Sequence, residues 1–224
     1  MYIKMEQKTA IVFGATGLVG NLLVEELTKS GNYNAVKIFV RQTTGVSEPR
    51  VEEIITDFSV PESYISRVTG DDLFICTGTT IKKAGSVENV EKIDKDLPAL
   101  VAEAAFKNGI KRIAVVSSIG ADAKSKNYYL RIKGEMEETI LKLDFERTVI
   151  VRPSILLGER KEKRAGEIVG KAVMKVIQPV FTGKFKKYRP IHGRDVAKAM
   201  ISLLQEEADK KIFESDELKE IAKE

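Results

Sequence analysis

The sequence predicts an α/β protein in which helices cover both faces of one doubly wound parallel sheet. Two observations support this fold class: short apolar runs alternate with helical patterns along most of the chain, and a glycine-rich turn joins the first run to the first helix. Strands that alternate with helices at this spacing are typically parallel and joined by right-handed crossovers. The 224 residues, 43% of them hydrophobic, suffice for one domain with a sizeable core.

Six apolar runs have the length of strands. They span residues 9–13, 36–40, 51–55, 72–76, 112–116 and 147–151. Helical patterns lie between most of them, and two of these patterns end at Gly31 and Gly109, where glycine is suited to close a helix. Ligands of such sheets bind beyond the carboxyl ends of the strands, so the residues after each run are the expected site.

The glycine-rich turn is FGATGLVGN, residues 13–21. Gly14 would make the turn, Gly17 would let the backbone approach a phosphate, and Gly20 would let the helix lie against the sheet. A tight turn with close helix packing would explain one or two of the glycines without any ligand. Because a helix N-terminus attracts anions, three glycines after a strand favour a nucleotide cofactor. Its expected contacts here are Gly14, Ala15, Thr16, Gly17, Leu18 and Val19.

A second pattern points to proton transfer. Tyr129 and Lys133 are four positions apart, which places both side chains on one face of a helix. An adjacent ammonium favours the ionised form of a phenol, whose pKa is otherwise ~10. Ser117 and Ser118, at the preceding strand end, are both candidates to hold a substrate oxygen. Taken singly the pattern is weak, because Tyr33 and Lys37 show it too and an amphipathic helix with a packed tyrosine would also explain it.

Together the motifs resemble the short-chain dehydrogenase/reductase superfamily, specifically the Tat-interacting-protein branch of its atypical members. The similarity runs through GATGLVG, CTGTTIKKAG, SSIGADAKSKNYYLRIKGEME and RPSILLGERKEKRAGE, over nearly the whole chain. The resemblance implies a Rossmann fold that binds NADP(H), with a serine, Tyr129 and Lys133 as catalytic residues. By analogy with extended relatives, the serine is Ser118. An asparagine that many members carry on the preceding helix has no clear counterpart here.

The resemblance also assigns further cofactor contacts. Lys133 would touch the nicotinamide ribose, Pro153 and Ile155 would lie near the nicotinamide, and Asp57 and Phe58 would face the adenine. The end of the fourth run would contribute Cys76, Thr77, Gly78 and Thr79.

The end of the second run, VRQTTG, bears on the choice of cofactor. An acidic residue there usually binds a free ribose 2′-hydroxyl, whereas an arginine suits a 2′-phosphate. Arg41 therefore favours NADP(H) over NAD(H), although an exposed loop arginine would look the same in the sequence.

After the sixth run the alternation stops. We expect residues 155–224 to be a small extension on the substrate side of a cofactor-binding core of about residues 1–154, within a single domain. The extension has a charged segment at 159–167, helical patterns at 167–177 and 192–205, and the basic stretch KFKKYR at 184–189. A solvated loop explains that stretch more simply than nucleic-acid binding, because the formal net charge is only +4.

Other features narrow the class of protein. No window approaches eighteen consecutive apolar residues, and the single Cys76 excludes an internal disulfide, so we expect a cytoplasmic protein that does not enter a membrane. His192 is the only histidine, and it lies in RPIHGRDVAKAM, which resembles a segment of extended family members where the histidine opens a helix with Asp195 in its first turn. We therefore expect His192 to be structural, and we expect no metal site.

The sequence thus predicts an NADP(H)-dependent oxidoreductase that transfers hydride to or from a small carbonyl, alcohol or sugar-nucleotide-like substrate. The alternative is a regulatory module that senses NADPH and binds a protein partner without turnover. A monomer and a homodimer are equally compatible with the sequence.

Overall fold

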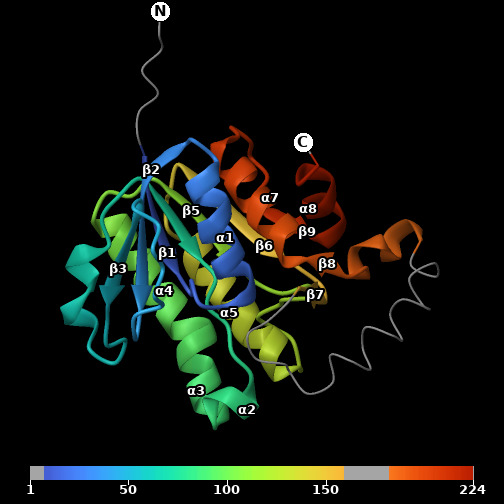
Figure 1. Cartoon of the computed structure of the whole chain (residues 1–224). Coiled ribbons are helices and arrows are strands. Elements are labelled where there is room, and N and C mark those ends of the chain that lie inside the picture. The colour runs from blue at the N-terminus through green and yellow to red at the C-terminus, as the bar shows by residue number, and fades with distance from the viewer. Residues whose placement is uncertain (1–7, 159–181, 224) are drawn as a thin grey trace, which may run out of the picture.

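A seven-stranded, wholly parallel sheet forms the centre of the molecule in the computed structural model, which describes residues 8–158 and 182–223. The strand order is β3-β2-β1-β4-β5-β6-β9. Figure 1 shows the sheet, with all of these strands labelled except β4. The strands are β1 (Lys8–Phe13), β2 (Tyr33–Val40), β3 (Val51–Ile55), β4 (Asp72–Ile75), β5 (Arg112–Val116), β6 (Arg147–Arg152) and β9 (Ile212–Glu214). The predicted fold class is confirmed.

The side chains of β1 show how the two faces of the sheet are built. Ala10 and Val12 belong to one buried cluster, and Ile11 and Phe13 belong to the other. Successive residues of a strand point to opposite faces, so an uninterrupted apolar run is what a sheet covered on both sides requires.

Helices from different parts of the chain cover the two faces (Figure 1). One face is covered by α1 (Leu18–Lys29), α7 (Gly193–Gln205) and α8 (Ser215–Ile221), and the other by α4 (Leu97–Lys107) and α5 (Tyr128–Leu141). Gly31 and Gly109 follow α1 and α4 with positive φ angles of 69° and 84°, as expected for residues that close helices.

The segment between β4 and β5 contains an irregular helix. It begins with α2 (Ile81–Ala84) and α3 (Val87–Glu91), passes through the π-helical segment η3 (Lys92–Asp96), and continues as α4. Short 3₁₀ turns, η1 (Pro61–Ser63) and η2 (Ile65–Arg67), follow β3. The π-helical segment was not predicted.

The region after β6 contributes directly to the main sheet and its core. Strand β9 pairs with β6, and α7 packs against α1, where Arg194 forms ion pairs with Glu25 and Glu26. We expected six strands and missed β9, because a strand of three residues is too short to show a periodic pattern. The predicted helix at 192–205 is confirmed as α7.

The rest of this region is described only in part. β7 (Leu156–Leu157) pairs with β8 (Ile191–His192). All of the basic stretch except Arg189 lies in the 3₁₀ helix η5 (Gly183–Tyr188). The charged segment at 159–167 and the helix expected at 167–177 lie outside the described residues.

Candidate functional site

The glycine-rich turn follows β1 and leads into α1. Gly14 has a φ angle of 82°, and a side chain there would place its Cβ 2.5 Å from the backbone of Cys76. A Cβ at Gly20 would lie 2.1 Å from the carbonyl oxygen of Gly14, so the helix touches the turn at this point. At Gly17 the nearest protein atom would be 3.3 Å away. Two of the glycines are therefore required by the fold, whereas a Cβ at Gly17 would make a tight contact with the Gly14 carbonyl oxygen that a small shift could relieve.

The first turn of α1 is suited to an anion. Gly17 is the N-cap residue, no side chain caps the helix, and no acidic residue occurs in the first turn. The unpaired N–H groups there and the positive end of the helix dipole would bind a pyrophosphate. Thr16 and Gly17 are exposed beside this turn, Leu18 is half-buried, and Ala15 and Val19 are buried. These residues fit a dinucleotide.

The residues expected to contact the adenosine of the cofactor follow β2 and β3. Arg41 is exposed and has no hydrogen-bond or ion-pair partner among the described residues. Asp57 is also exposed, and its Oδ1 accepts hydrogen bonds from the Ser59 N–H and hydroxyl at 2.9 and 2.7 Å, which lower its pKa. Phe58 is half-buried and packs edge-on against Tyr64.

The end of β4 lies directly beside the glycine turn. Cys76 is half-buried, and burial raises the pKa of its thiol to about 12, so it stays protonated at neutral pH. The Thr77 hydroxyl oxygen is buried without a partner in the described part of the chain, which leaves it able to bond a ligand. Gly78 is exposed, and the Thr79 N–H donates to Asp94 Oδ2 at 2.9 Å.

The tyrosine and the lysine lie on α5 as expected, in different surroundings. The Tyr129 side chain is 39% exposed, whereas Lys133 is only 2% exposed. Lys133 Nζ lies 2.8 Å from Oδ1 of Asp94, a fully buried residue of η3. Burial lowers the pKa of Lys133, but Asp94 and then Tyr129 outweigh it, so the pKa is raised and the ammonium persists.

The neighbouring Tyr128 and the similar pair Tyr33–Lys37 bond other groups. The Tyr128 hydroxyl donates to the Val87 carbonyl at 3.0 Å. Tyr33 donates to Asp72 at 2.5 Å and Lys37 donates to the Thr69 carbonyl at 3.1 Å, so the other tyrosine and lysine with this spacing bond different groups.

The two serines after β5 are also distinguished. Ser117 is 4% exposed and its hydroxyl donates to the buried Glu137, which in turn pairs with Arg152. Ser118 is half-buried and its hydroxyl has no hydrogen bond among the described residues. Of the two hydroxyls, that of Ser118 is therefore the one free to bond a substrate.

Asp94 is the site residue that the sequence reasoning missed. A signal was present, because Asp94 lies four residues after Val90 and four before Pro98, and all three are buried. A carboxylate on the apolar stripe of a helix needs a buried partner. Only the structure identifies that partner as Lys133.

The loop after β6 carries the two residues that the resemblance assigns to the nicotinamide. Pro153 is buried and its carbonyl accepts from the Ile119 N–H at 3.1 Å, whereas Ile155 is 51% exposed. His192 occupies the N-cap position of α7, with Asp195 in the first turn, and its side chain makes no capping bond.

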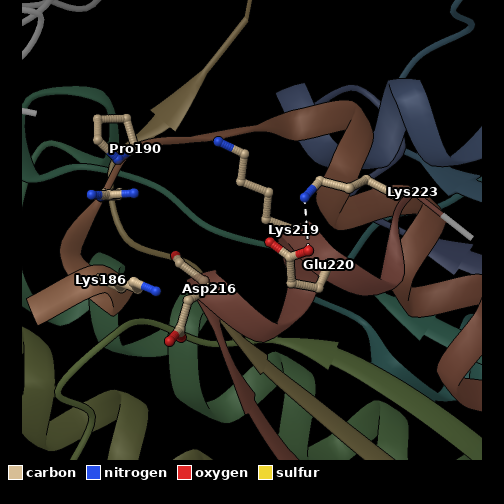
Figure 2. A pocket seen from close by; sticks show the side chains of 8 residues that line it. Lys186, Pro190, Asp216, Lys219, Glu220 and Lys223 are labelled. Carbon is tan, nitrogen blue, oxygen red and sulfur yellow. Dashed lines mark hydrogen bonds and ion pairs between the residues drawn. The ribbon is translucent and has the colours of Figure 1, made fainter. Parts of the chain in front are cut away.

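A separate hollow of about 250 Å³ lies between η5 and α8 (Figure 2). Its lining includes Lys186, Arg189 and Lys219 together with the acidic Asp216 and Glu220, and Glu220 pairs with Lys223 at 2.7 Å. None of the predicted cofactor or catalytic residues lines it. Ser154, in the loop after β6, bonds two residues that line the hollow: its hydroxyl donates to the Arg189 carbonyl at 2.5 Å, and its N–H donates to the Ser215 hydroxyl oxygen at 2.6 Å.

Comparison with known proteins identifies the family of this chain. A family model described as NAD(P)H-binding matches residues 14–207. The mitochondrial protein FMP52 of Eremothecium gossypii is 37% identical over 221 residues, covering 96% of this chain and 97% of that protein. Protein HTATIP2 of Rattus norvegicus is 34% identical over 168 residues, covering 73% of this chain and 69% of that protein.

Solved structures show the same fold at low sequence identity. The Bordetella bronchiseptica enzyme WbmG, solved in complex with NAD, has a TM-score of 0.70 and 14% identity, covering 100% of this chain and 78% of its own. UDP-glucose 4-epimerase of Thermotoga maritima, solved with UDP-glucose, has a TM-score of 0.67 and 16% identity, covering 96% of this chain and 81% of its own.

The fold and the site define an NAD(P)(H)-binding protein with a Rossmann fold. This chain belongs to the atypical short-chain dehydrogenase/reductase family that includes FMP52 and HTATIP2. The resemblance stated from its motifs is confirmed.

The expectation of a cytoplasmic protein is contradicted, because the FMP52 relatives that cover most of this chain are named as mitochondrial proteins. A lone cysteine indicates a reducing setting and does not distinguish one such compartment from another. Within residues 8–158 and 182–223, no helix is both long and apolar enough to cross a bilayer.

Proposed function

We propose that this chain is an NADP(H)-dependent oxidoreductase acting on a small carbonyl, alcohol or sugar-nucleotide-like molecule. The observation that carries the proposal is the arrangement on α5: an exposed Tyr129 one turn before a buried, charged Lys133. A structural tyrosine would be buried or bonded to the protein, as Tyr128 is bonded to Val87.

Each side chain then has a defined task. A nicotinamide cofactor, when bound, would supply or accept the hydride. In the reducing direction, Tyr129 donates its proton to the substrate oxygen while the Ser118 hydroxyl holds that oxygen by a hydrogen bond. The Lys133 ammonium stabilises the phenolate that Tyr129 becomes, because an opposite charge nearby favours the ionised form.

The preference for NADP(H) rests on Arg41. Its unpartnered guanidinium at the end of β2 suits the 2′-phosphate that distinguishes NADPH from NADH.

The test compares Tyr129→Phe and Lys133→Met with Tyr128→Phe, a neighbouring tyrosine on the same helix. NADPH oxidation is followed at about 340 nm with a panel of aldehydes, ketones and quinones. Tyr129→Phe should lower turnover by ~100- to 10,000-fold with nearly unchanged NADPH affinity, as expected for loss of a general acid. Tyr128→Phe should keep most of the activity.

Two outcomes would count against the proposal. Turnover that survives Tyr129→Phe would remove the catalytic role of this tyrosine. A wild-type protein that binds NADPH but is inactive on the whole panel would favour a cofactor-sensing module with a protein partner instead.

A further inference from the structure

One buried carboxylate joins the catalytic lysine to the cofactor-binding loop. Asp94 Oδ1 lies 2.8 Å from Lys133 Nζ, and Asp94 Oδ2 accepts the Thr79 N–H at 2.9 Å. Asp94 is fully buried and Lys133 is 2% exposed, so solvent does not weaken the pair. A displacement of Lys133 or of the Thr79 backbone would therefore disturb the position of the other through Asp94.

The backbone at Asp94 is unusual in a way that favours a functional role. Asp94 lies in η3, a π-helical segment between two α-helical ones. Such segments are rare and occur frequently at functional sites. Two further contacts hold this part of the chain to α5: the Tyr128 hydroxyl to the Val87 carbonyl at 3.0 Å, and Lys95 to Glu135 at 3.3 Å.

Stability alone does not explain the pair. Removing two charges from water costs several kcal/mol per ion, and well-packed apolar residues of similar volume are often equally stable or more so. A buried pair is thus better explained by what it does for Lys133 and for the Thr79 loop.

The charges that face Lys133 come from two elements. Asp94 approaches from η3, and Tyr129 and Glu137 act from α5 itself. Glu137 is already paired with Arg152 at the end of β6, so Asp94 is the carboxylate in direct contact with the ammonium.

We propose that Asp94 is a positioning residue: its two carboxylate oxygens hold the Lys133 ammonium and the Thr79 N–H in one arrangement, so that the cofactor loop and the proton-transferring pair are set together. This inference rests on the proposed oxidoreductase function, but part of its test does not depend on turnover.

Two substitutions of Asp94 separate its two contacts. Asp94→Asn keeps an oxygen for the Thr79 N–H and removes the charge that faces Lys133, whereas Asp94→Ala removes both. We expect Asp94→Asn to lower turnover by ~10-fold or more while NADPH affinity changes less than about threefold. Asp94→Ala should also weaken NADPH binding by about tenfold, since the Thr79 N–H loses its acceptor.

Asp96→Asn is the matched control. Asp96 lies in the same π-helical segment, its side chain is 58% exposed, and it is 3.8 Å from Lys95. Its substitution should leave both turnover and NADPH affinity near the wild-type values. A merely structural role for Asp94 would instead lower thermal stability without a split between turnover and cofactor affinity.

A double-mutant cycle tests whether Asp94 acts through Lys133. In a Lys133→Met background, Asp94→Asn should cause no further loss of turnover, because the group that it positions is gone. This double variant also removes both buried charges together, which leaves no unpaired ion and favours folding. Losses that simply multiply would overturn the proposal.

The readout that needs no substrate is the titration of Lys133, followed by ¹³C NMR of protein labelled at lysine Cε and assigned with Lys133→Met. Asp94→Asn should lower the Lys133 pKa, because it removes the anion that opposes the effect of burial. Asp96→Asn should not change it. If the wild type shows no turnover, the proposed function fails. This titration and the NADPH affinities still test the positioning role of Asp94. An unchanged Lys133 pKa in Asp94→Asn would overturn the role of Asp94.

Discussion

Arg41 is the residue whose replacement should change the choice between the two nicotinamide cofactors. Arg41→Ala should weaken NADPH binding by ~10- to 100-fold and leave NADH affinity unchanged, because NADH lacks the phosphate that a guanidinium would pair with. Calorimetric titration of both cofactors measures this. Arg67→Ala, at another exposed arginine in η2, should alter neither affinity.

A companion variant at Gly17 checks that the same site binds both cofactors. A Cβ at Gly17 would lie 3.3 Å from the Gly14 carbonyl oxygen, a tight contact that needs only a small shift of the turn. Gly17→Val should therefore still fold, as circular dichroism would check, and abolish binding of NADPH and NADH alike. Equal NADPH and NADH affinities in the wild type would show that Arg41 is only an exposed loop residue.

Single residues also show which parts of the candidate site can be predicted from the sequence and which cannot. The spacing of Tyr129 and Lys133 predicted a shared helix face, and α5 provides it. The choice of Ser118 rested on analogy and stays a prediction; the structure adds that the other candidate, Ser117, bonds Glu137. Asp94 was missed because its partner is thirty-nine positions away along the chain, and no local spacing relates them.

At the scale of elements, α5 depends on close contact with the loop that precedes it. A Cβ at Gly134 would lie 2.1 Å from the Ala123 nitrogen, and backbone atoms cannot move aside as a flexible side chain would. Gly134→Ala should therefore destabilise the protein by about 1–3 kcal/mol, measured by chemical denaturation. Helix propensity alone predicts the opposite sign, since alanine favours a helix by about 1 kcal/mol over glycine.

The control for this element is Glu138→Ala, an exposed position on the same helix. Its effect should stay within about 0.5 kcal/mol. A stabilised Gly134→Ala variant would mean that α5 is free to move away from residues 122 and 123.

At the scale of the whole molecule, a buried network at the amino ends of the strands should limit stability at alkaline pH. The Tyr33 hydroxyl donates to Asp72 at 2.5 Å, and Arg112 and Gln205 bond the same carboxylate. These contacts join β2, β4, β5 and α7. Burial, followed by the charge of Asp72, raises the pKa of Tyr33 above its ordinary value.

The sign follows from proton linkage. Above pH ~10 the unfolded chain loses the tyrosine proton while the folded protein keeps it, so unfolding becomes easier as pH rises. Tyr33 should contribute a decline in unfolding free energy of up to ~1.4 kcal/mol per pH unit in this range. Denaturant unfolding between pH 8 and 11 should show a shallower decline in Tyr33→Phe than in the wild type or in the exposed-site control Tyr188→Phe. Parallel curves for all three proteins would contradict this role for Tyr33.

The sequence by itself determined the parallel α/β class, six of the seven main strands, the glycine turn and the Tyr129–Lys133 face. These features are local, because strand runs, turn residues and helix spacing are each recorded within a few neighbouring positions. The tertiary structure decided what depends on distant segments meeting: the pairing of the short β9 with β6, the packing of α7 on α1, and the partner of each buried charge. A three-residue strand and a buried Asp94 gain their stability from neighbours far along the chain, and only the folded molecule shows which neighbours those are.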